Sequence, residues 1–177
     1  NDLISIVDAC SEIGISQIVI PLVDGGRIEN VDHSKALLDF LHEKEDVFSD
    51  RGIQILFESD FGPDELKVFI GSFKSEVFGI SYDIGNSAAL GFEVDKEFAA
   101  YGDRILNVHI KDRILKGTTV PLGDGNANFT KVFRQLAMIG YGGNYILQTA
   151  RANNGDHSGV LSYYKSMVEE WIVNNGS

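Results

Sequence analysis

Four polar side chains of the sequence lie at or just beyond the ends of apolar runs. They are Glu58, Asp83, His109 and Gln148. Two carboxylates, an imidazole and a carboxamide together offer the oxygen and nitrogen ligands that suit Mn²⁺, Mg²⁺, Co²⁺ or Zn²⁺. These side chains can meet at one point only if the apolar runs are neighbouring strands that end at the same edge of a sheet.

The order of elements along the chain predicts such a sheet. Five apolar runs rich in β-branched residues are each followed by a polar loop and a stretch with helical periodicity. The runs are Gln17–Leu22, Ile53–Phe57, Gly79–Tyr82, Ile105–Ile110 and Tyr145–Leu147. Alternating strands and helices predict parallel βαβ units, and in parallel α/β folds ligands bind at the carboxyl ends of the strands.

The expected helices have recognisable ends. They are Leu3–Ile13, His33–Lys44, a helix that begins at Pro63, a helix between Asn128 and Gly140, and Ser162–Val173. Asn128 suits an N-cap and Gly140 a helix stop. We interpret residues 1–177 as one α/β domain of about five parallel βα units. A closed (β/α)₈ barrel needs roughly 250 residues, so the prediction is a partial barrel without three N-terminal units, or a smaller open sheet.

The composition restricts the class of protein. With 44% hydrophobic and 23% charged residues, the chain has the make-up of an ordinary globular protein. Its formal net charge of -11 argues against nucleic acid or an anionic membrane as a partner. No apolar run approaches the roughly 20 residues that a membrane span needs. The single cysteine, Cys10, excludes an internal disulfide and a cysteine-rich zinc site, and we expect a cytoplasmic protein.

Four segments around the strand ends carry a resemblance to a known family. They are Glu58-Ser59-Asp60, Tyr82-Asp83-Ile84-Gly85-Asn86, Val108-His109-Ile110-Lys111-Asp112 and Pro121-Leu122-Gly123-Asp124-Gly125-Asn126. In this order and spacing the chain resembles the xylose-isomerase-like TIM-barrel superfamily of metal-dependent sugar and sugar-phosphate isomerases and epimerases. The run from Asp83 to Gln148 is similar to the L-ribulose-5-phosphate 3-epimerase and hexulose-6-phosphate isomerase type. The resemblance covers essentially the whole chain and implies strands four to eight of the barrel.

The resemblance implies a metal site and a reaction. Family members hold a divalent metal with Glu, Asp, His and Glu at the ends of strands five to eight, which correspond here to Glu58, Asp83, His109 and Gln148. Family epimerases use two carboxylates as base and acid around an enediolate, which implies catalytic roles for Glu58 and Gln148. Gln148 departs from the pattern and cannot exchange a proton near pH 7. A 1,2-isomerisation, which can use a single base, is therefore favoured over an epimerisation that needs two. Asp60, two residues beyond Glu58, is a backup acid.

Further polar residues near the strand ends are candidate contacts for sugar hydroxyl or phosphate groups. They are Asn86, Lys111, Arg113 and Arg151. The alternative for the three cations is ion pairing with the abundant acids, and Asn86 could instead cap a turn.

The four proposed ligands also have structural alternatives. His109 could be a core histidine, Asp83 a helix N-cap or Asx-turn, and Glu58 part of a salt bridge at the rim. Gln148 could make a structural hydrogen bond. Three other histidines are expected to be solvated rather than metal-bound; they are His33, His42 and His157.

Other functions remain in competition. A non-catalytic sugar-binding or assembly module is the main alternative. The enzyme and this module would both take a small-molecule sugar or sugar phosphate as partner. Endonuclease IV shares the barrel, but it needs a histidine-rich trinuclear zinc site and a basic face, whereas this chain has four histidines and a charge of -11. The loop Gly123–Asn126 lacks the context of a nucleotide-binding motif. A five-strand piece would also expose two sheet edges, which predicts a homo-oligomer formed through them.

Overall fold

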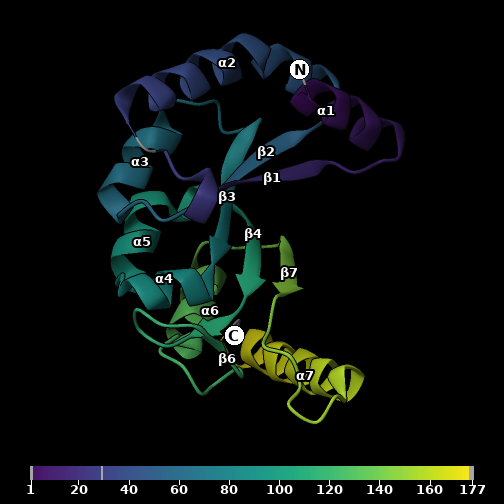
Figure 1. Ribbon diagram of the computed structural model, residues 1–177. Helices are drawn as coiled ribbons and strands as arrows, with labels where there is room; N and C mark the ends of the chain where they lie inside the picture. Colours follow the sequence, from purple (N-terminus) through teal and green to yellow (C-terminus); the bar gives the residue numbers. More distant parts are fainter. Residues whose placement is uncertain (1, 29, 176–177) are drawn as a thin grey trace.

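The computed structural model describes residues 2–28 and 30–175, which form a curved parallel sheet with helices arranged around its outer side (Figure 1). Five strands follow one another in sequence order across the sheet, and every neighbouring pair is parallel. They are β1 (Gln17–Leu22), β2 (Gln54–Ser59), β3 (Phe78–Asp83), β4 (Ile105–Ile110) and β7 (Asn144–Leu147). A short antiparallel hairpin follows β4 and consists of β5 (Asp112–Arg113) and β6 (Thr119–Val120).

Helices connect the strands in the order expected of βα units. They are α1 (Asp2–Glu12), α2 (Val31–Asp50), α3 (Pro63–Gly71), α4 (Ile84–Leu90), α5 (Val94–Tyr101), α6 (Phe129–Met138) and α7 (His157–Asn175), with 3-10 turns η1 (Asp24–Gly26) and η2 (Gly102–Arg104). The Asn128 side chain caps α6 by accepting a hydrogen bond from the Lys131 amide, as the sequence predicts. The predicted α/β class with parallel βα units is confirmed.

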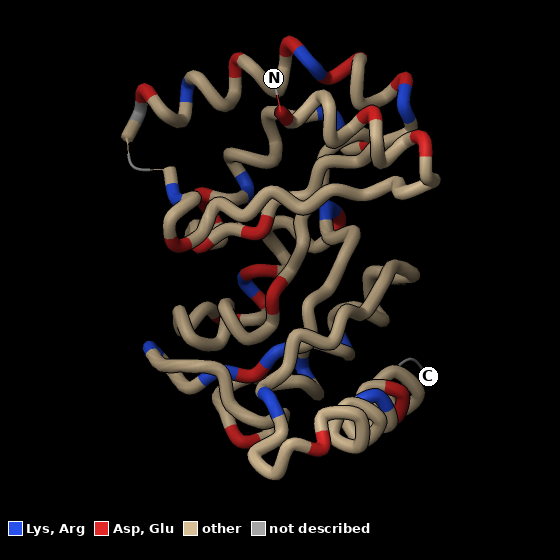
Figure 2. The backbone as a smooth tube through the Cα atoms, turned by 45° about the vertical axis from the view of Figure 1, so that its right-hand side comes forward, with Lys and Arg blue, Asp and Glu red and all other residues tan. Residues whose placement is uncertain are grey.

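Two differences from the predicted elements are instructive. The helix predicted to end at Lys44 continues as α2 to Asp50, because Phe48 beyond the charged stretch is fully buried. Figure 2 shows that acidic residues outnumber basic ones along this helix. After β3 the chain forms two short helices, α4 and α5, separated by Gly91 in the left-handed conformation at φ 75°. The helix before the last strand and the first helix lie within a residue or two of their predicted bounds.

The hydrophobic core lies between the outer face of the sheet and the helices. Alternate residues of each strand point outward, and in the three middle strands, β2, β3 and β4, these are almost all apolar and buried. Phe57, Phe78, Ile80, Val108 and Ile110 are each 2% exposed or less. Burying one such side chain stabilises a fold by about 1.5–3 kcal/mol. The core therefore fixes which residues of each strand face outward, and so which face the other way.

The sheet has two open edges. β1 and β7 are the terminal strands of the sheet order, so the barrel is not closed. Between them lies a hollow of about 410 Å³, lined by Val19, Asn107, His109 and Ile146 among others. Within the described residues no helix combines the length and the apolar character needed to cross a membrane. The inner face and its carboxyl edge are where the polar strand-end residues lie.

Candidate metal centre

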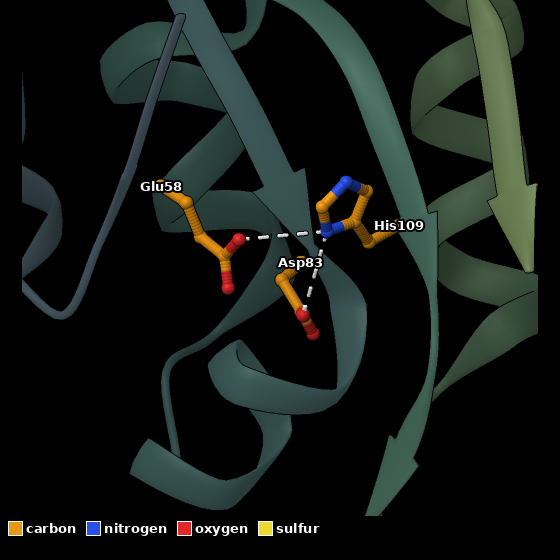
Figure 3. Close-up of side chains that lie close together, drawn as sticks. All are labelled: Glu58, Asp83 and His109. Atoms are coloured by element: carbon orange, nitrogen blue, oxygen red, sulfur yellow. Dashed lines mark ion pairs between the residues drawn. The ribbon is translucent and has the colours of Figure 1, made fainter. Parts of the chain in front are cut away.

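The structure brings three of the four proposed ligands together at the carboxyl edge of the sheet (Figure 3). Glu58, Asp83 and His109 come from β2, β3 and β4 and offer ligand atoms that all lie within 4.8 Å of one another. Nδ1 of His109 is 3.5 Å from Oε2 of Glu58 and 3.8 Å from Oδ2 of Asp83. Their side chains are 12%, 1% and 13% exposed in the order Glu58, Asp83, His109, so this is a nearly buried group.

A β-bulge places His109 on the inner face. Ile80 of β3 pairs with Ile105 of β4, but the next residue, Ser81, pairs with Asn107, so Leu106 is an extra residue in β4. Strict alternation from the outward-facing Ile105 would turn His109 toward the helices. The extra residue shifts the phase by one, and His109 therefore lies beside Asp83.

A glycine makes room for this bulge. A Cβ atom at Gly79 would lie 2.5 Å from Cδ1 of Leu106 and 3.0 Å from the carbonyl oxygen of Arg104. The side chain of Arg104 holds the start of the bulged strand, because its guanidinium donates to the carbonyl oxygens of Ile70, Phe73 and Phe78. Gly79 and Arg104 thus support the local geometry that orients His109.

Asp83 caps a helix with one carboxylate oxygen and faces His109 with the other. Its Oδ1 accepts a hydrogen bond of 2.8 Å from the Asn86 amide and caps α4. Its Oδ2 faces His109 and accepts a hydrogen bond of 2.7 Å from Nζ of Lys111. Burial acts to raise the pKa of Asp83, but the His109 ring and the Lys111 ammonium outweigh it and hold the pKa below its usual value. Asp83 is therefore an anion at neutral pH.

Glu58 has one oxygen engaged and one directed toward the cluster. Asn86 Nδ2 donates to Oε1 at 2.8 Å, while Oε2 is the atom that faces His109. Burial, followed by the negative charge of Asp83, raises the pKa of Glu58, and the positive groups nearby only partly offset this. A carboxylate with a raised pKa is a better proton acceptor than an ordinary one.

His109 supplies the observation that tests the site for a metal. Its Nδ1 is buried and, among the residues that the structure describes, has no hydrogen-bond partner. Its Nε2 lies 3.5 Å from Oγ of Ser81, which also accepts a hydrogen bond of 3.0 Å from Asn107. A histidine ligand commonly donates through its second nitrogen to an orienting group. An unpartnered imidazole nitrogen between two carboxylates fits a small divalent cation, whose bonds to such ligands measure about 2.0–2.2 Å.

The remaining predicted site residues are arranged around this group. Gln148 is exposed just beyond β7, and its backbone N–H donates to the carbonyl oxygen of Ile110 at 3.0 Å. His109 pairs with Ile146, and Gln148 follows Ile146 by two residues, the period at which residues of a strand share a face. Arg151 is exposed in the following loop. Asp60 forms an ion pair with Arg27, which lies in the loop after β1.

Some residues at the site escaped the sequence analysis. Ser81, Asn107 and Arg27 were not singled out. Ser81 and Asn107 lie two positions before Asp83 and His109, so the period of two along a strand could have indicated them as inner-face neighbours. No periodic signal marks Arg27. Two histidines far from the site have other contacts: the His42 ring lies 4.8 Å from that of Phe73, and Nδ1 of His157 accepts from the Ala152 amide.

A second buried carboxylate lies behind the site. Glu97 of α5 is 1% exposed and accepts hydrogen bonds from the hydroxyl groups of Tyr82, Ser87 and Tyr101, at 2.9, 2.6 and 2.8 Å. Burial raises the pKa of Glu97, and the three donors offset part of that effect. The network connects β3, α4 and α5 and so holds the residues on either side of Asp83.

Comparisons with known proteins place this geometry in context. A family model described as Xylose isomerase-like TIM barrel matches residues 1–166. The uncharacterized protein MJ1311 of Methanocaldococcus jannaschii is 28% identical over 145 residues, covering 75% of this chain and 50% of that protein. The L-ribulose-5-phosphate 3-epimerase UlaE of Escherichia coli O1:K1 / APEC is 34% identical over 107 residues, covering 59% and 37%. The crystal structure of the IOLI protein with a binding zinc atom has a TM-score of 0.80 at 18% identity, over 98% of this chain and 69% of that one. The chain spans half or less of the length of these two curated relatives.

Proposed function

Because the chain belongs to the xylose isomerase-like TIM barrel family, we propose that it carries the metal-binding part of a sugar or sugar-phosphate isomerase or epimerase. The observation that carries the proposal is the buried, unpartnered Nδ1 of His109 between Glu58 and Asp83. These three residues would hold Mn²⁺, Mg²⁺, Co²⁺ or Zn²⁺, with the side-chain oxygen of Gln148 as a fourth ligand. The similarity to an L-ribulose-5-phosphate 3-epimerase supports a sugar phosphate as substrate.

Each residue has a stated role in this proposal. Glu58 is the base that removes the proton next to the sugar carbonyl and leaves an enediolate. The cation, when bound, would polarise the carbonyl and stabilise the negative charge on the sugar oxygens. Lys111 and Arg151 would bind hydroxyl or phosphate groups of the substrate. Asp83 stays ionised and holds Lys111 at the edge of the site.

One observation favours a second candidate, a non-catalytic sugar-binding or assembly module. The fourth position is Gln148, which is neutral at all ordinary pH values and cannot act as an acid or a base. A module of this kind would keep the hollow and its polar rim and would not exchange substrate protons. The two candidates therefore differ in chemistry rather than in binding.

Elemental analysis and proton exchange distinguish them. The purified chain is analysed for bound metal, then incubated with pentulose and hexulose phosphates in D₂O with added Mg²⁺ or Zn²⁺ and followed by NMR. Metal binding with deuterium entering next to the carbonyl supports the enzyme, and loss of exchange in Glu58→Gln identifies the base. Deuterium at carbon 1 or 2 indicates aldose–ketose isomerisation, and deuterium at carbon 3 indicates 3-epimerisation. A chain that binds sugar, binds no metal and catalyses no deuterium exchange is the non-catalytic module.

A further inference from the structure

The carboxamide of Asn86 lies between a carboxylate and two cations. Its Nδ2 donates to Oε1 of Glu58 at 2.8 Å. Its Oδ1 accepts from Nη1 of Arg113 at 2.8 Å and from Nζ of Lys111 at 3.4 Å. The opposite orientation would set an NH₂ group against two cations and an oxygen against a carboxylate. The positive groups therefore determine which end of the amide faces Glu58.

Arg113 is itself held in place by the hairpin that follows β4. Its Nε and Nη2 both donate to the carbonyl oxygen of Gly117, at 3.2 and 2.8 Å. Its own carbonyl oxygen accepts a hydrogen bond of 2.9 Å from the Asn126 amide. A guanidinium is a planar, rigid fork, so two bonds to one carbonyl fix the direction of the third. The remaining donor, Nη1, is thus directed at Asn86.

We propose that Arg113 is a positioning residue that acts through Asn86 to direct one oxygen of Glu58 toward the metal position. With Oε1 held by Asn86, Oε2 is the oxygen 3.5 Å from Nδ1 of His109. The inference rests on the proposed metal site. It gives Arg113 a role in the unliganded protein, before any sugar or phosphate is present, and it makes the β5–β6 hairpin part of the site's framework.

The sign of the effect separates positioning from simple charge. A cation next to a metal site repels a divalent ion, so removing Arg113 would raise metal affinity if only its charge mattered. Removing a group that orients a ligand lowers metal affinity, typically by 10–100-fold. The two explanations predict opposite changes for the same substitution.

A Co²⁺ titration of a set of variants tests the inference. The set is Arg113→Met, Asn86→Leu, the double variant, and the control Lys116→Met, which removes an exposed cation from the same hairpin. We expect Arg113→Met and Asn86→Leu each to weaken Co²⁺ binding about tenfold and to shift the visible Co²⁺ spectrum toward that of Glu58→Gln. The double variant should be no weaker than Asn86→Leu alone, because Arg113 acts through that residue. Lys116→Met should bind like the unmodified chain.

The outcomes are decisive for each part of the argument. Unchanged or stronger binding in Arg113→Met, or fully additive losses in the double variant, overturns the positioning role while leaving the metal site intact. An unmodified chain that does not bind Co²⁺ overturns both the metal site and the inference. Thermal unfolding checks that each variant folds. If Arg113→Met does not, Arg113→Lys replaces it: its single ammonium cannot reproduce the fork, and it must still weaken Co²⁺ binding at least threefold.

Discussion

The carboxylate of Asp112 offers the most direct test of how the site's framework is held. Asp112 is 0% exposed, and all of its hydrogen bonds here come from backbone amides of the loop after β6. Oδ2 accepts from Gly123 and Gly125, both at 2.9 Å, and Oδ1 accepts from Ala127 at 3.1 Å. This loop leads directly into α6. We predict that Asp112→Asn, which changes shape very little, destabilises the chain substantially.

The size of the expected loss in unfolding free energy follows from the three hydrogen bonds that Asp112 accepts. With the new NH₂ group on the Oδ1 side, it faces the Ala127 amide, so one charge-assisted bond of about 1.5–3 kcal/mol is lost. The other two bonds change from charged to neutral acceptors, which costs roughly 1 kcal/mol each. The sum is about 4 kcal/mol, and the partial exposure of the loop amides reduces it to about 3 kcal/mol. The opposite orientation of the amide breaks two bonds instead of one and is worse.

Urea unfolding followed by circular dichroism measures the loss. Asp124→Asn is the matched control, because Asp124 lies in the same loop with an exposed side chain and undergoes the same change of charge. We expect the control to unfold within about 0.5 kcal/mol of the unmodified chain. Hydrogen exchange at the amides of Gly123, Gly125 and Ala127 should accelerate only in Asp112→Asn. A loss below about 1 kcal/mol, or one equal to the control's, would refute the reasoning.

Three further changes test other parts of the structure. The pKa of Glu97 is raised from its ordinary value of 4.5, so the contribution of this group to the stability of the fold falls as the pH rises above 4.5. In urea titrations the stability of Glu97→Gln should therefore rise relative to that of the unmodified chain as the pH increases above 4.5, by about 1.4 kcal/mol per unit of raised pKa; a pH-independent difference would contradict this. In Gly79→Ala the new methyl group presses on Leu106, which should lower the free energy of unfolding in urea by about 1–3 kcal/mol. It should also weaken Co²⁺ binding by displacing His109. Adding Leu106→Ala should restore part of the stability and part of the Co²⁺ affinity. Unchanged unfolding and binding would show that the bulge does not depend on Gly79. Gln148→Glu adds a charged ligand and should raise Mn²⁺ affinity by about tenfold or more in calorimetry, and no gain would mean that residue 148 does not point into the site.

The strands could be predicted from the sequence because burial on the outer face leaves a clear signal. β1 and β4 have the predicted bounds, and the polar residues at the strand ends fall at one edge of the sheet. The last six residues of α2, Glu45–Asp50, could not be predicted, since Glu43–Asp46 is a run of charged residues with no apolar period. Phe48 continues the helix because its ring packs edge-on against that of Phe78 at 6.0 Å, a contact with a residue distant in sequence.

The bulge that places His109 on the inner face could not be derived from its own strand. In the run Ile105–Ile110 the polar residues Asn107 and His109 alternate with apolar ones, but nothing in the run marks Leu106 as an extra residue. Strict alternation from the buried Ile105 predicts the wrong face. The packing of Leu106 against Gly79 of the neighbouring strand reverses the phase, and only the family resemblance anticipated the result. Local periodicity predicts that a strand exists, whereas tertiary contacts decide which way it faces.

The engagement of the acids around the site limits the chemistry that the proposed enzyme can perform. Asp60 is paired with an arginine, Asp112 is saturated by backbone amides, and Asp83 divides its oxygens between a helix cap and a lysine. Among the described residues, this leaves Glu58 as the carboxylate with an oxygen directed at the cluster and a raised pKa. Gln148 cannot deliver a proton to the opposite face of the substrate. A single base that removes and returns a proton on one face can support a 1,2-isomerisation, whereas inversion at carbon 3 needs a second group. The arrangement of charges therefore favours isomerisation, and deuterium at carbon 3 would require an acid from outside this set.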